Sequence, residues 1–231
     1  AGILSMLVDG GADCVELGMP FSDPVADGVT IQSASQVSLE RGASPKAALC
    51  VAEKAARMGL RVVWMSYANP LMRAGLERAA LRLGSAGAQA LIVPDLPMEE
   101  AGRWSGIFRD AGIALPLFAA PTTPYKRLAA IGRRAGAFVY YVSLEGTTGE
   151  RKVLPAGLAA RLEIVRRAVR KPLAVGFGVS NPRHAAQVAR RAEGVIVGSA
   201  LVRRLAGWGR SEGRRGVARW VRRMALAVHS A

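Results

Sequence analysis

Short apolar runs alternate with longer amphipathic segments along the whole chain. Runs rich in Val, Leu, Ile and aromatic residues are typical of buried strands, and their short length favours strands over helices. About seven strands are predicted, at Asp13–Leu17, Leu60–Met65, Ala90–Val93, Leu115–Ala119, Ala137–Val142, Leu173–Gly176 and Gly194–Val197.

The segments between these runs have the period of amphipathic helices. Leu158, Leu162, Val165 and Val169 form one apolar stripe, and a similar stripe runs through residues 217–228. Each stripe lies opposite Arg side chains on the same helix. We therefore expect each helix to pack on a sheet through its apolar face and to expose its Arg face to solvent. Further helices are predicted over Gly2–Val8 and Thr30–Glu40.

Glycine marks the passage from helix to strand in five places, with the sequences DGGAD, RMGLR, SAGAQA, DAGIA and RAGAF. A residue with positive φ commonly ends a helix, and glycine adopts that conformation without steric cost. We therefore expect each of these glycines to cap the preceding helix.

Alternation of strand and helix at this spacing predicts a parallel sheet with right-handed crossovers, either an open doubly wound sheet or a closed (β/α)8 TIM barrel. No GxGxxG motif follows the first strand, which disfavours a dinucleotide-binding Rossmann fold. Polar or Gly-rich clusters follow nearly every strand, and in a barrel all of these would meet on one face. The pattern therefore favours the barrel.

A complete barrel of this class has eight strands, and the sequence indicates about seven. The chain opens on a helical segment that leads into the Asp13–Leu17 strand. We therefore expect the first strand and the helix before it to lie upstream, and we predict one N-terminally incomplete barrel domain over residues 1–231.

The composition of the chain disfavours several classes of protein. The chain has 231 residues, 51% of them hydrophobic, which suits one sizeable core. No apolar run reaches the length of a membrane span, and Cys14 and Cys50 lack the spacing of a zinc site or a disulfide framework. A cytoplasmic setting is expected, with no membrane association and no metal.

The net charge of +15 comes mainly from Arg side chains spread along the helical segments. No aromatic-interleaved basic stripe and no nucleic-acid-binding module accompanies them, so a nucleic-acid partner is not expected. A basic field of this kind can still attract an anionic small molecule.

Two carboxyl groups stand out in the stretch ELGMPFSDPVADG, which begins at the end of the first predicted strand. If Glu16 points into the barrel, partial desolvation at the strand end would raise the pKa of its carboxyl and suit it to acid–base catalysis. If Glu16 points outward, it would instead pair with an Arg. Asp23 or Asp27 could simply form the turn or cap the following helix. Two carboxylates on one loop also suit a metal, but no third acidic or His ligand stands close by in the sequence. His184 and His229 fall in predicted helices, which disfavours a Ser-His-Asp triad.

Two Gly-rich segments near the C-terminal end of the chain, GFGVSNP and VGSA, each end a predicted strand and open a helix, and GTTG precedes them in the sequence. Loops after the last two strands of a barrel often bind phosphate through backbone N–H groups. The same glycines could simply form tight turns. Together with the carboxyl groups, they indicate a barrel enzyme that acts on a phosphorylated metabolite by acid–base chemistry.

The motifs ELGMPFSDPVADGVTIQ, YANP, PDLPMEE, SLEGTTG, GFGVSNP and VGSALV resemble, in this order, those of the tryptophan synthase alpha chain family. The resemblance implies a lyase of tryptophan biosynthesis that cleaves indole-3-glycerol phosphate into indole and glyceraldehyde 3-phosphate by a retro-aldol reaction. It also implies that this chain uses no cofactor. Pyridoxal phosphate would belong to the beta chain, the partner in a heterotetramer of two alpha and two beta chains.

By motif position, the resemblance makes Glu16 the catalytic acid and base, Asp27 the group that binds the indole N–H, and Tyr140 a neighbour of the reacting centre. It gives a set of phosphate-binding positions, Gly149, Gly178, Gly198 and Ser199, and a set that lines the indole pocket or its closing loop, Ile31, Met65, Tyr67, Ile92, Thr148 and Phe177. The loop Pro20–Asp27, with Asn69 and Pro97, would face the beta chain.

Two other functions remain open at this point. An incomplete barrel could serve only as a binding or activating partner of the beta chain. Another phosphate-binding barrel enzyme, such as an isomerase of a related pathway, would share the Gly-rich loops.

Overall fold

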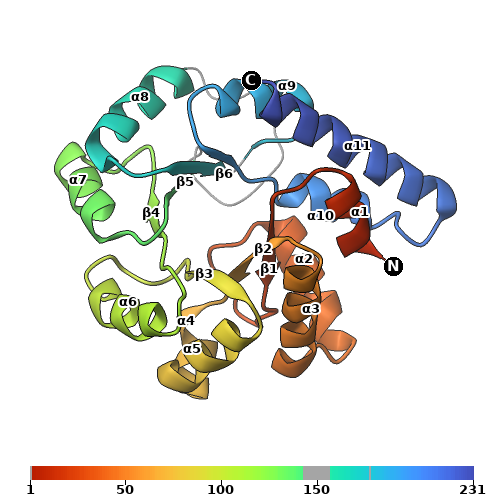
Figure 1. The fold of residues 1–231 in the computed structure, drawn as a ribbon, viewed down its shortest axis with the longest axis horizontal. Helices are drawn as coiled ribbons and strands as arrows, with labels where there is room; N and C mark the ends of the chain where they lie inside the picture. Colours follow the sequence, from red (N-terminus) through yellow and green to blue (C-terminus); the bar gives the residue numbers. More distant parts are fainter. Residues whose placement is uncertain (1, 143–156, 177) are drawn as a thin grey trace.

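The computed structural model describes residues 2–142, 157–176 and 178–231. Within these residues the strands lie at the centre and the helices surround them (Figure 1). All strand pairs are parallel. The strands are β1 (Cys14–Gly18), β2 (Arg61–Met65), β3 (Ala88–Ile92), β4 (Leu117–Ala119), β5 (Val139–Val142), β6 (Leu173–Gly176) and β7 (Gly194–Val195).

The helices follow the strands in an alternating order and agree closely with the predicted segments. The helix predicted over Leu158–Val169 has those same bounds. The helices are α1 (Ile3–Asp9), α2 (Val29–Glu40), α3 (Pro45–Arg57), α4 (Ala68–Ala74), α5 (Leu76–Ser85), α6 (Ala101–Asp110), α7 (Tyr125–Arg134), α8 (Leu158–Val169), α9 (Pro182–Ala189), α10 (Ser199–Leu205) and α11 (Ser211–His229).

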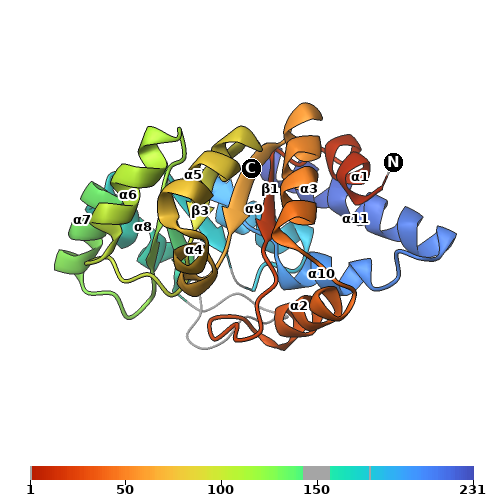
Figure 2. The ribbon, with the colours of Figure 1, turned by 90° about the horizontal axis from the view of Figure 1, so that it is seen from below.

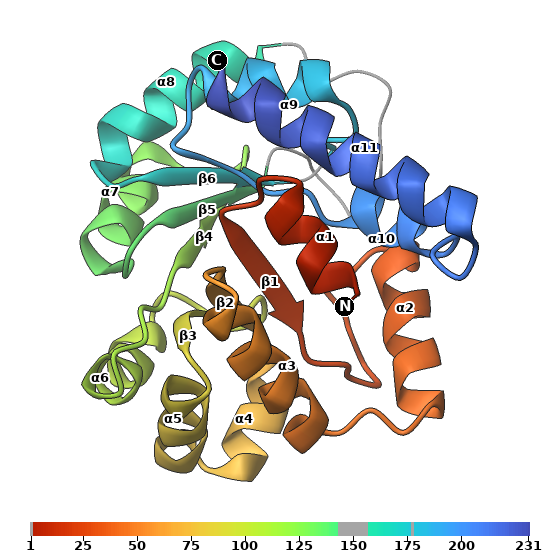
Figure 3. The same ribbon diagram turned by 45° about the vertical axis from the view of Figure 1, so that its right-hand side comes forward.

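The strands form two hydrogen-bonded groups, β1-β2-β3 and β4-β5-β6-β7. A parallel bridge between Ala90 and Ala114 connects the two groups. Among the described residues, no backbone pairing joins β7 to β1. On that side α2 packs against α10 and α1 packs against α11 (Figure 3).

Side chains alternate between the two faces of each strand, and the alternation separates the core from the barrel interior. Val15, Val62 and Leu91 belong to the main hydrophobic cluster between strands and helices. Their neighbours on the opposite face, among them Glu16 and Ala90, lie outside that cluster. The core is therefore the layer between strands and helices, and the other face is left for a site.

The predicted glycine caps hold in four of the five turns, where Gly11, Gly59, Gly87 and Gly112 have positive φ. The prediction is wrong for RAGAF, where Ala137 takes the positive φ. A side chain on its neighbour Gly136 would lie 2.7 Å from the backbone nitrogen of Leu115. Close backbone approach, and not a left-handed conformation, therefore requires this glycine.

Close packing of α7 on α8 gives a prediction about stability. A Cβ at Gly132 of α7 would overlap the carbonyl oxygen of Val169, a backbone atom that side-chain rotation cannot move away. We expect Gly132→Ala to lower the free energy of unfolding by about 3 kcal/mol, as overpacking does. Gly102→Ala in α6, where a Cβ meets nothing within 4 Å, should raise it slightly. Equal urea-unfolding midpoints for the two variants would contradict this account of the packing.

Candidate active site

Glu16 lies in the middle of β1, level with Val63 of β2 and Ala90 of β3. Its neighbour Val15 packs into the core, so the Glu16 side chain points to the other face, into the barrel. No ion pair between Glu16 and a basic side chain occurs in the described part of the chain. Of the two orientations left open by the sequence, the structure has the inward one.

The environment of Glu16 favours its protonated form. The pKa of the carboxyl is raised to about 7, first by desolvation among surrounding protein atoms and then by the negative charge of Asp27. The side chain is still accessible to solvent at its surface. The shift therefore reflects the density of protein around the carboxyl and not complete exclusion of water. A carboxyl with this pKa can both give and take a proton near neutral pH.

Asp27 ends the loop between β1 and α2 and is 7% exposed. Its Oδ2 accepts a hydrogen bond from the Tyr67 hydroxyl at 3.0 Å, and its backbone carbonyl accepts one from Gln32 Nε2 at 2.8 Å. Burial raises the pKa of this carboxyl, and the hydrogen bond from Tyr67 opposes the shift. The loop after β1 thus places Asp27 where its charge acts on Glu16.

Tyr67 does more than line a pocket, which is the role that the resemblance implied for it. Its hydroxyl donates to Asp27 and accepts a hydrogen bond from the backbone N–H of Ala26 at 3.0 Å. The ring is 2% exposed and packs against Phe21 at a centroid distance of 5.3 Å. Tyr67 therefore holds the loop and orients the Asp27 carboxyl. Residues 40 positions apart make this contact, so only the fold reveals it.

Asp95 supports Tyr67 from the next loop. Its Oδ1 accepts a hydrogen bond of 2.9 Å from the N–H of Ala68, the first residue of α4. The loops after β2 and β3, which carry the YANP and PDLP motifs, are thereby tied together beside Tyr67.

Tyr140 of β5 reaches the same interior from the opposite strand group. Its ring packs against Phe118 of β4 at a centroid distance of 4.8 Å. A Cβ on Gly176 of β6 would lie 2.6 Å from the Tyr140 hydroxyl, so only glycine leaves room for this tyrosine. Burial raises the pKa of Tyr140 well above its usual value, and the charges of Glu16 and Asp27 raise it further. The three predicted catalytic residues therefore act on one another across one space.

The predicted indole-pocket residues that the structure describes are found near this space. Met65 and Ile92 are adjacent in register at the ends of β2 and β3, level with Gly18 of β1. Ile92 is buried, whereas Met65 and Ile31, the latter in the first turn of α2, are half-buried. Thr148 and Phe177 lie outside the described residues.

The predicted phosphate positions follow the last two strands. Gly178 follows β6 with φ of +79°, and Gly198 and Ser199 form the start of α10 after β7. A Cβ on Gly198 would meet nothing within 4 Å, so its backbone is open to approach. The loop after β1, α2 and α10 lie at the same end of the molecule (Figure 2). Gly149 lies outside the described residues.

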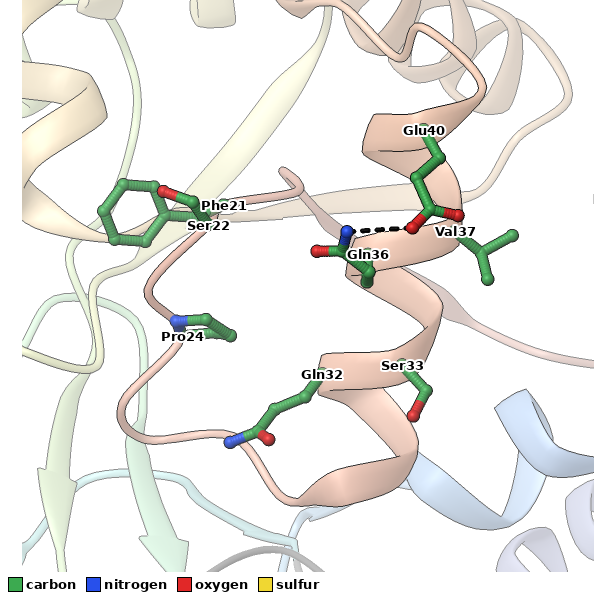
Figure 4. Close-up of a pocket in the computed structure, with 8 residues that line it drawn as sticks. All are labelled: Phe21, Ser22, Pro24, Gln32, Ser33, Gln36, Val37 and Glu40. Carbon is green, nitrogen blue, oxygen red and sulfur yellow. Dashed lines mark hydrogen bonds between the residues drawn. The ribbon is translucent and has the colours of Figure 1, made fainter.

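A separate hollow of about 390 Å³ lies between the loop after β1 and α2 (Figure 4). Phe21, Ser22 and Pro24 line it from the loop, and Gln32 and Gln36 line it from α2. Glu16 and Tyr140 are not among its lining residues. This hollow is therefore distinct from the space that the catalytic candidates share.

The described residues were also searched for clusters of metal-ligating side chains and for long apolar helices. No group of three or more His, Cys, Asp or Glu side chains there is placed to hold a metal ion. In the same residues, no helix has both the length and the apolar character needed to cross a bilayer.

The sequence and the fold were compared with those of known proteins. The sequence matches the family described as "Tryptophan synthase alpha chain" over residues 1–226. The chain belongs to the tryptophan synthase alpha chain family. The tryptophan synthase alpha chain of Chloroflexus aggregans is 46% identical over 220 residues, which cover 94% of this chain and 82% of the relative. That of Roseiflexus castenholzii is 48% identical over 198 residues, covering 85% and 76% of the two chains.

Solved structures agree with the alpha-chain family. A structure of Mycobacterium tuberculosis tryptophan synthase matches with a TM-score of 0.88 at 35% identity, over 97% of this chain and 84% of that chain. Tryptophan synthase subunit alpha from Legionella pneumophila gives a TM-score of 0.88 at 32% identity, over 99% and 86%. These matches confirm the predicted family, its barrel fold with about seven strands in this chain, and its assignment as a lyase of tryptophan biosynthesis.

Proposed function

We propose that this chain cleaves indole-3-glycerol phosphate to indole and glyceraldehyde 3-phosphate, with Glu16 as acid and base and Asp27 as the group that binds the indole nitrogen. The observation that carries the proposal is the inward Glu16 carboxyl, whose pKa of about 7 depends in part on the charge of Asp27. Family membership supplies the substrate, and this geometry supports the roles that the family resemblance implies for Glu16 and Asp27.

The proposed steps balance in protons and electrons. Protonated Glu16 gives its proton to the indole ring carbon that carries the glycerol phosphate chain, and the ionised Asp27 stabilises the positive charge on the ring nitrogen. The Glu16 carboxylate then removes the proton of the adjacent hydroxyl group. The carbon–carbon bond breaks, its electrons restore the aromatic ring, and Glu16 ends protonated as it began.

Binding of the phosphate group is assigned to Gly178, Gly198 and Ser199 among the described residues, and to Gly149. Open backbone at Gly198 and the position of all three described residues after β6 and β7 support this assignment. Met65, Ile92 and Ile31 supply apolar surface for the indole ring, together with Phe177; Thr148 would contribute from the loop that closes over the site.

The proposed chemistry requires no cofactor from this chain, because Glu16 performs both proton transfers, first as a carboxylic acid and then as a carboxylate. Pyridoxal phosphate would belong to the beta chain, with which this chain would form a heterotetramer of two alpha and two beta chains. Val25 within the loop Pro20–Asp27 and Val29 at the start of α2 are both about three-quarters exposed and offer apolar surface for that contact. Asn69 and Pro97 are also exposed. As a biosynthetic lyase, the protein would work in the cytoplasm.

We further propose that residues 1–231 act as one domain. A single hydrophobic cluster that extends from Met6 of α1 to Met224 of α11 supports this.

The test is release of indole when the chain is incubated with indole-3-glycerol phosphate, with and without a beta chain from a related organism. Release of indole by this chain alone supports the proposal. Absence of indole together with a rise in beta-chain activity would overturn it in favour of a partner that only binds or activates. Absence of both effects would contradict both the cleavage activity and the role as an activating partner.

The hydrogen bond from Tyr67 to Asp27 predicts a change in pH dependence. Tyr67→Phe keeps the ring that packs on Phe21 but removes the donor that lowers the pKa of Asp27. The acidic limb of kcat/KM, which requires ionised Asp27, should therefore move to higher pH. Tyr125→Phe, at a position 59% exposed on α7, serves as the matched control. An acidic limb at the same pH in all three proteins would show that Tyr67 does not orient Asp27.

A further inference from the structure

Two of the buried polar side chains among the described residues, Ser180 and His184, lie beside the turn that follows β6. Each is 5% exposed. The His184 Nδ1 atom is 3.3 Å from the carbonyl oxygen of Gly178 and 3.4 Å from the Ser180 hydroxyl oxygen. Neither side chain has a part in the acid–base steps, so their burial at this turn calls for a separate account.

The contact with Gly178 indicates which tautomer the imidazole ring takes. A carbonyl oxygen only accepts hydrogen bonds, so the tautomer that satisfies this contact carries the hydrogen on Nδ1 and donates it to Gly178. The backbone N–H of His184 donates to Asn181 Oδ1 at 3.0 Å, which caps α9. His184 therefore contacts both ends of the turn, Gly178 through its side chain and Asn181 through its backbone N–H.

The bond to the Gly178 carbonyl also sets the direction of a whole peptide group. In a trans peptide the C=O and the following N–H point in opposite directions, so the Val179 N–H is turned away from His184. Gly178, with φ of +79°, has the conformational freedom to rotate this peptide. Rotation would present a carbonyl oxygen, which repels an anion, where an N–H group could otherwise donate.

We propose that His184 is a positioning residue of the phosphate site: its Nδ1–H holds the Gly178 carbonyl turned into the protein, so that this turn presents N–H groups to the substrate phosphate. The proposal rests on the phosphate-binding role proposed above for Gly178. The Ser180 hydroxyl oxygen lies 3.4 Å from the same nitrogen and can share its hydrogen only as a second acceptor. His184 acts through the backbone of the turn and does not itself touch the substrate.

The test compares three substitutions of His184 by calorimetric titration with glyceraldehyde 3-phosphate, inorganic phosphate and indole. His184→Leu removes the donor, and we expect the Kd for glyceraldehyde 3-phosphate and for phosphate to rise about tenfold, as loss of one hydrogen bond predicts. His184→Asn places an amide N–H close to the position of Nδ1 and should bind within about twofold of the wild type. The Kd for indole should be unchanged in both.

His184→Gln supplies a polar comparison if the Leu variant does not fold. Its longer side chain carries the amide past the Nδ1 position, so we expect it to behave like the Leu variant and not like the Asn variant. His229→Asn, at an exposed position of α11 that pairs with Asp13, is the matched control and should bind as the wild type does.

Several results would overturn the positioning role. They are unchanged affinity for glyceraldehyde 3-phosphate in the Leu and Gln variants, an Asn variant as weak as the Gln variant, or equal loss of affinity for indole and phosphate. A wild-type protein that binds neither phosphate ligand and releases no indole would instead overturn the proposed function itself. The two failures are therefore distinguishable.

Discussion

Glu16→Gln should lower kcat for indole release by about 1,000-fold or more, because one side chain performs both proton transfers and general acid–base catalysis contributes on this scale. Glutamine fills nearly the same volume, but its amide neither gives nor takes a proton at neutral pH. The described Gly-rich turns that would hold the phosphate group follow β6 and β7, and the substitution changes neither of these strands nor their turns. The Kd for glyceraldehyde 3-phosphate should therefore be unchanged.

Stability provides the control for Glu16→Gln. The pKa of Glu16 is raised from 4.5 to about 7 in the folded chain, so ionisation of this carboxyl opposes folding. Stability is therefore lost as the pH rises from the lower of these values through the higher one. The uncharged Glu16→Gln variant should unfold at a Tm equal to or above that of the wild type at pH 8. Glu212→Gln, in the exposed first turn of α11, should leave kcat unchanged. A kcat for Glu16→Gln comparable to that of the wild type would remove Glu16 from the reaction.

Asp27→Asn should lower kcat about 100-fold, since the substitution removes the negative charge that stabilises the protonated indole ring. The amide oxygen can still accept the hydrogen bond from Tyr67, so the loop should keep its position. The charge of Asp27 is also one cause of the raised pKa of Glu16. Its removal should therefore move the alkaline limb of kcat/KM to lower pH.

The matched control for this substitution is Asp110→Asn, at the exposed end of α6. It should leave both kcat and the pH profile unchanged. Asp27→Asn with wild-type kcat would contradict the role given to the carboxylate. A lower kcat with the alkaline limb in its original place would contradict the electrostatic link between the two carboxyl groups.

Much of the architecture follows from local patterns. Apolar runs give the strands to within about two residues, because strands buried by helices must be continuously apolar. Four of the five helix-ending glycines adopt positive φ, as their place in the sequence predicts. The exception, Gly136, is required by its contact with Leu115, and such a contact between distant segments is invisible in a local pattern.

The geometry of the candidate site is harder to predict from the sequence than the fold is. Alternation alone leaves the face of Glu16 undecided, because the inner face of a strand depends on which helices pack on the other side. The bond between Tyr67 and Asp27 and the bond between His184 and Gly178 depend on tertiary packing. The roles implied by family resemblance for Gly149, Thr148 and Phe177 stay predictions, since these residues lie outside the described part of the chain.

The most direct test of the central claim is the pH dependence of kcat/KM for cleavage of indole-3-glycerol phosphate by the unmodified chain. This parameter reports the ionisations of the free enzyme, in which Glu16 must be protonated and Asp27 ionised. The account predicts a bell-shaped profile whose alkaline limb falls near pH 7, the pKa to which Glu16 is raised. A profile that stays flat or rises through pH 8 would contradict it.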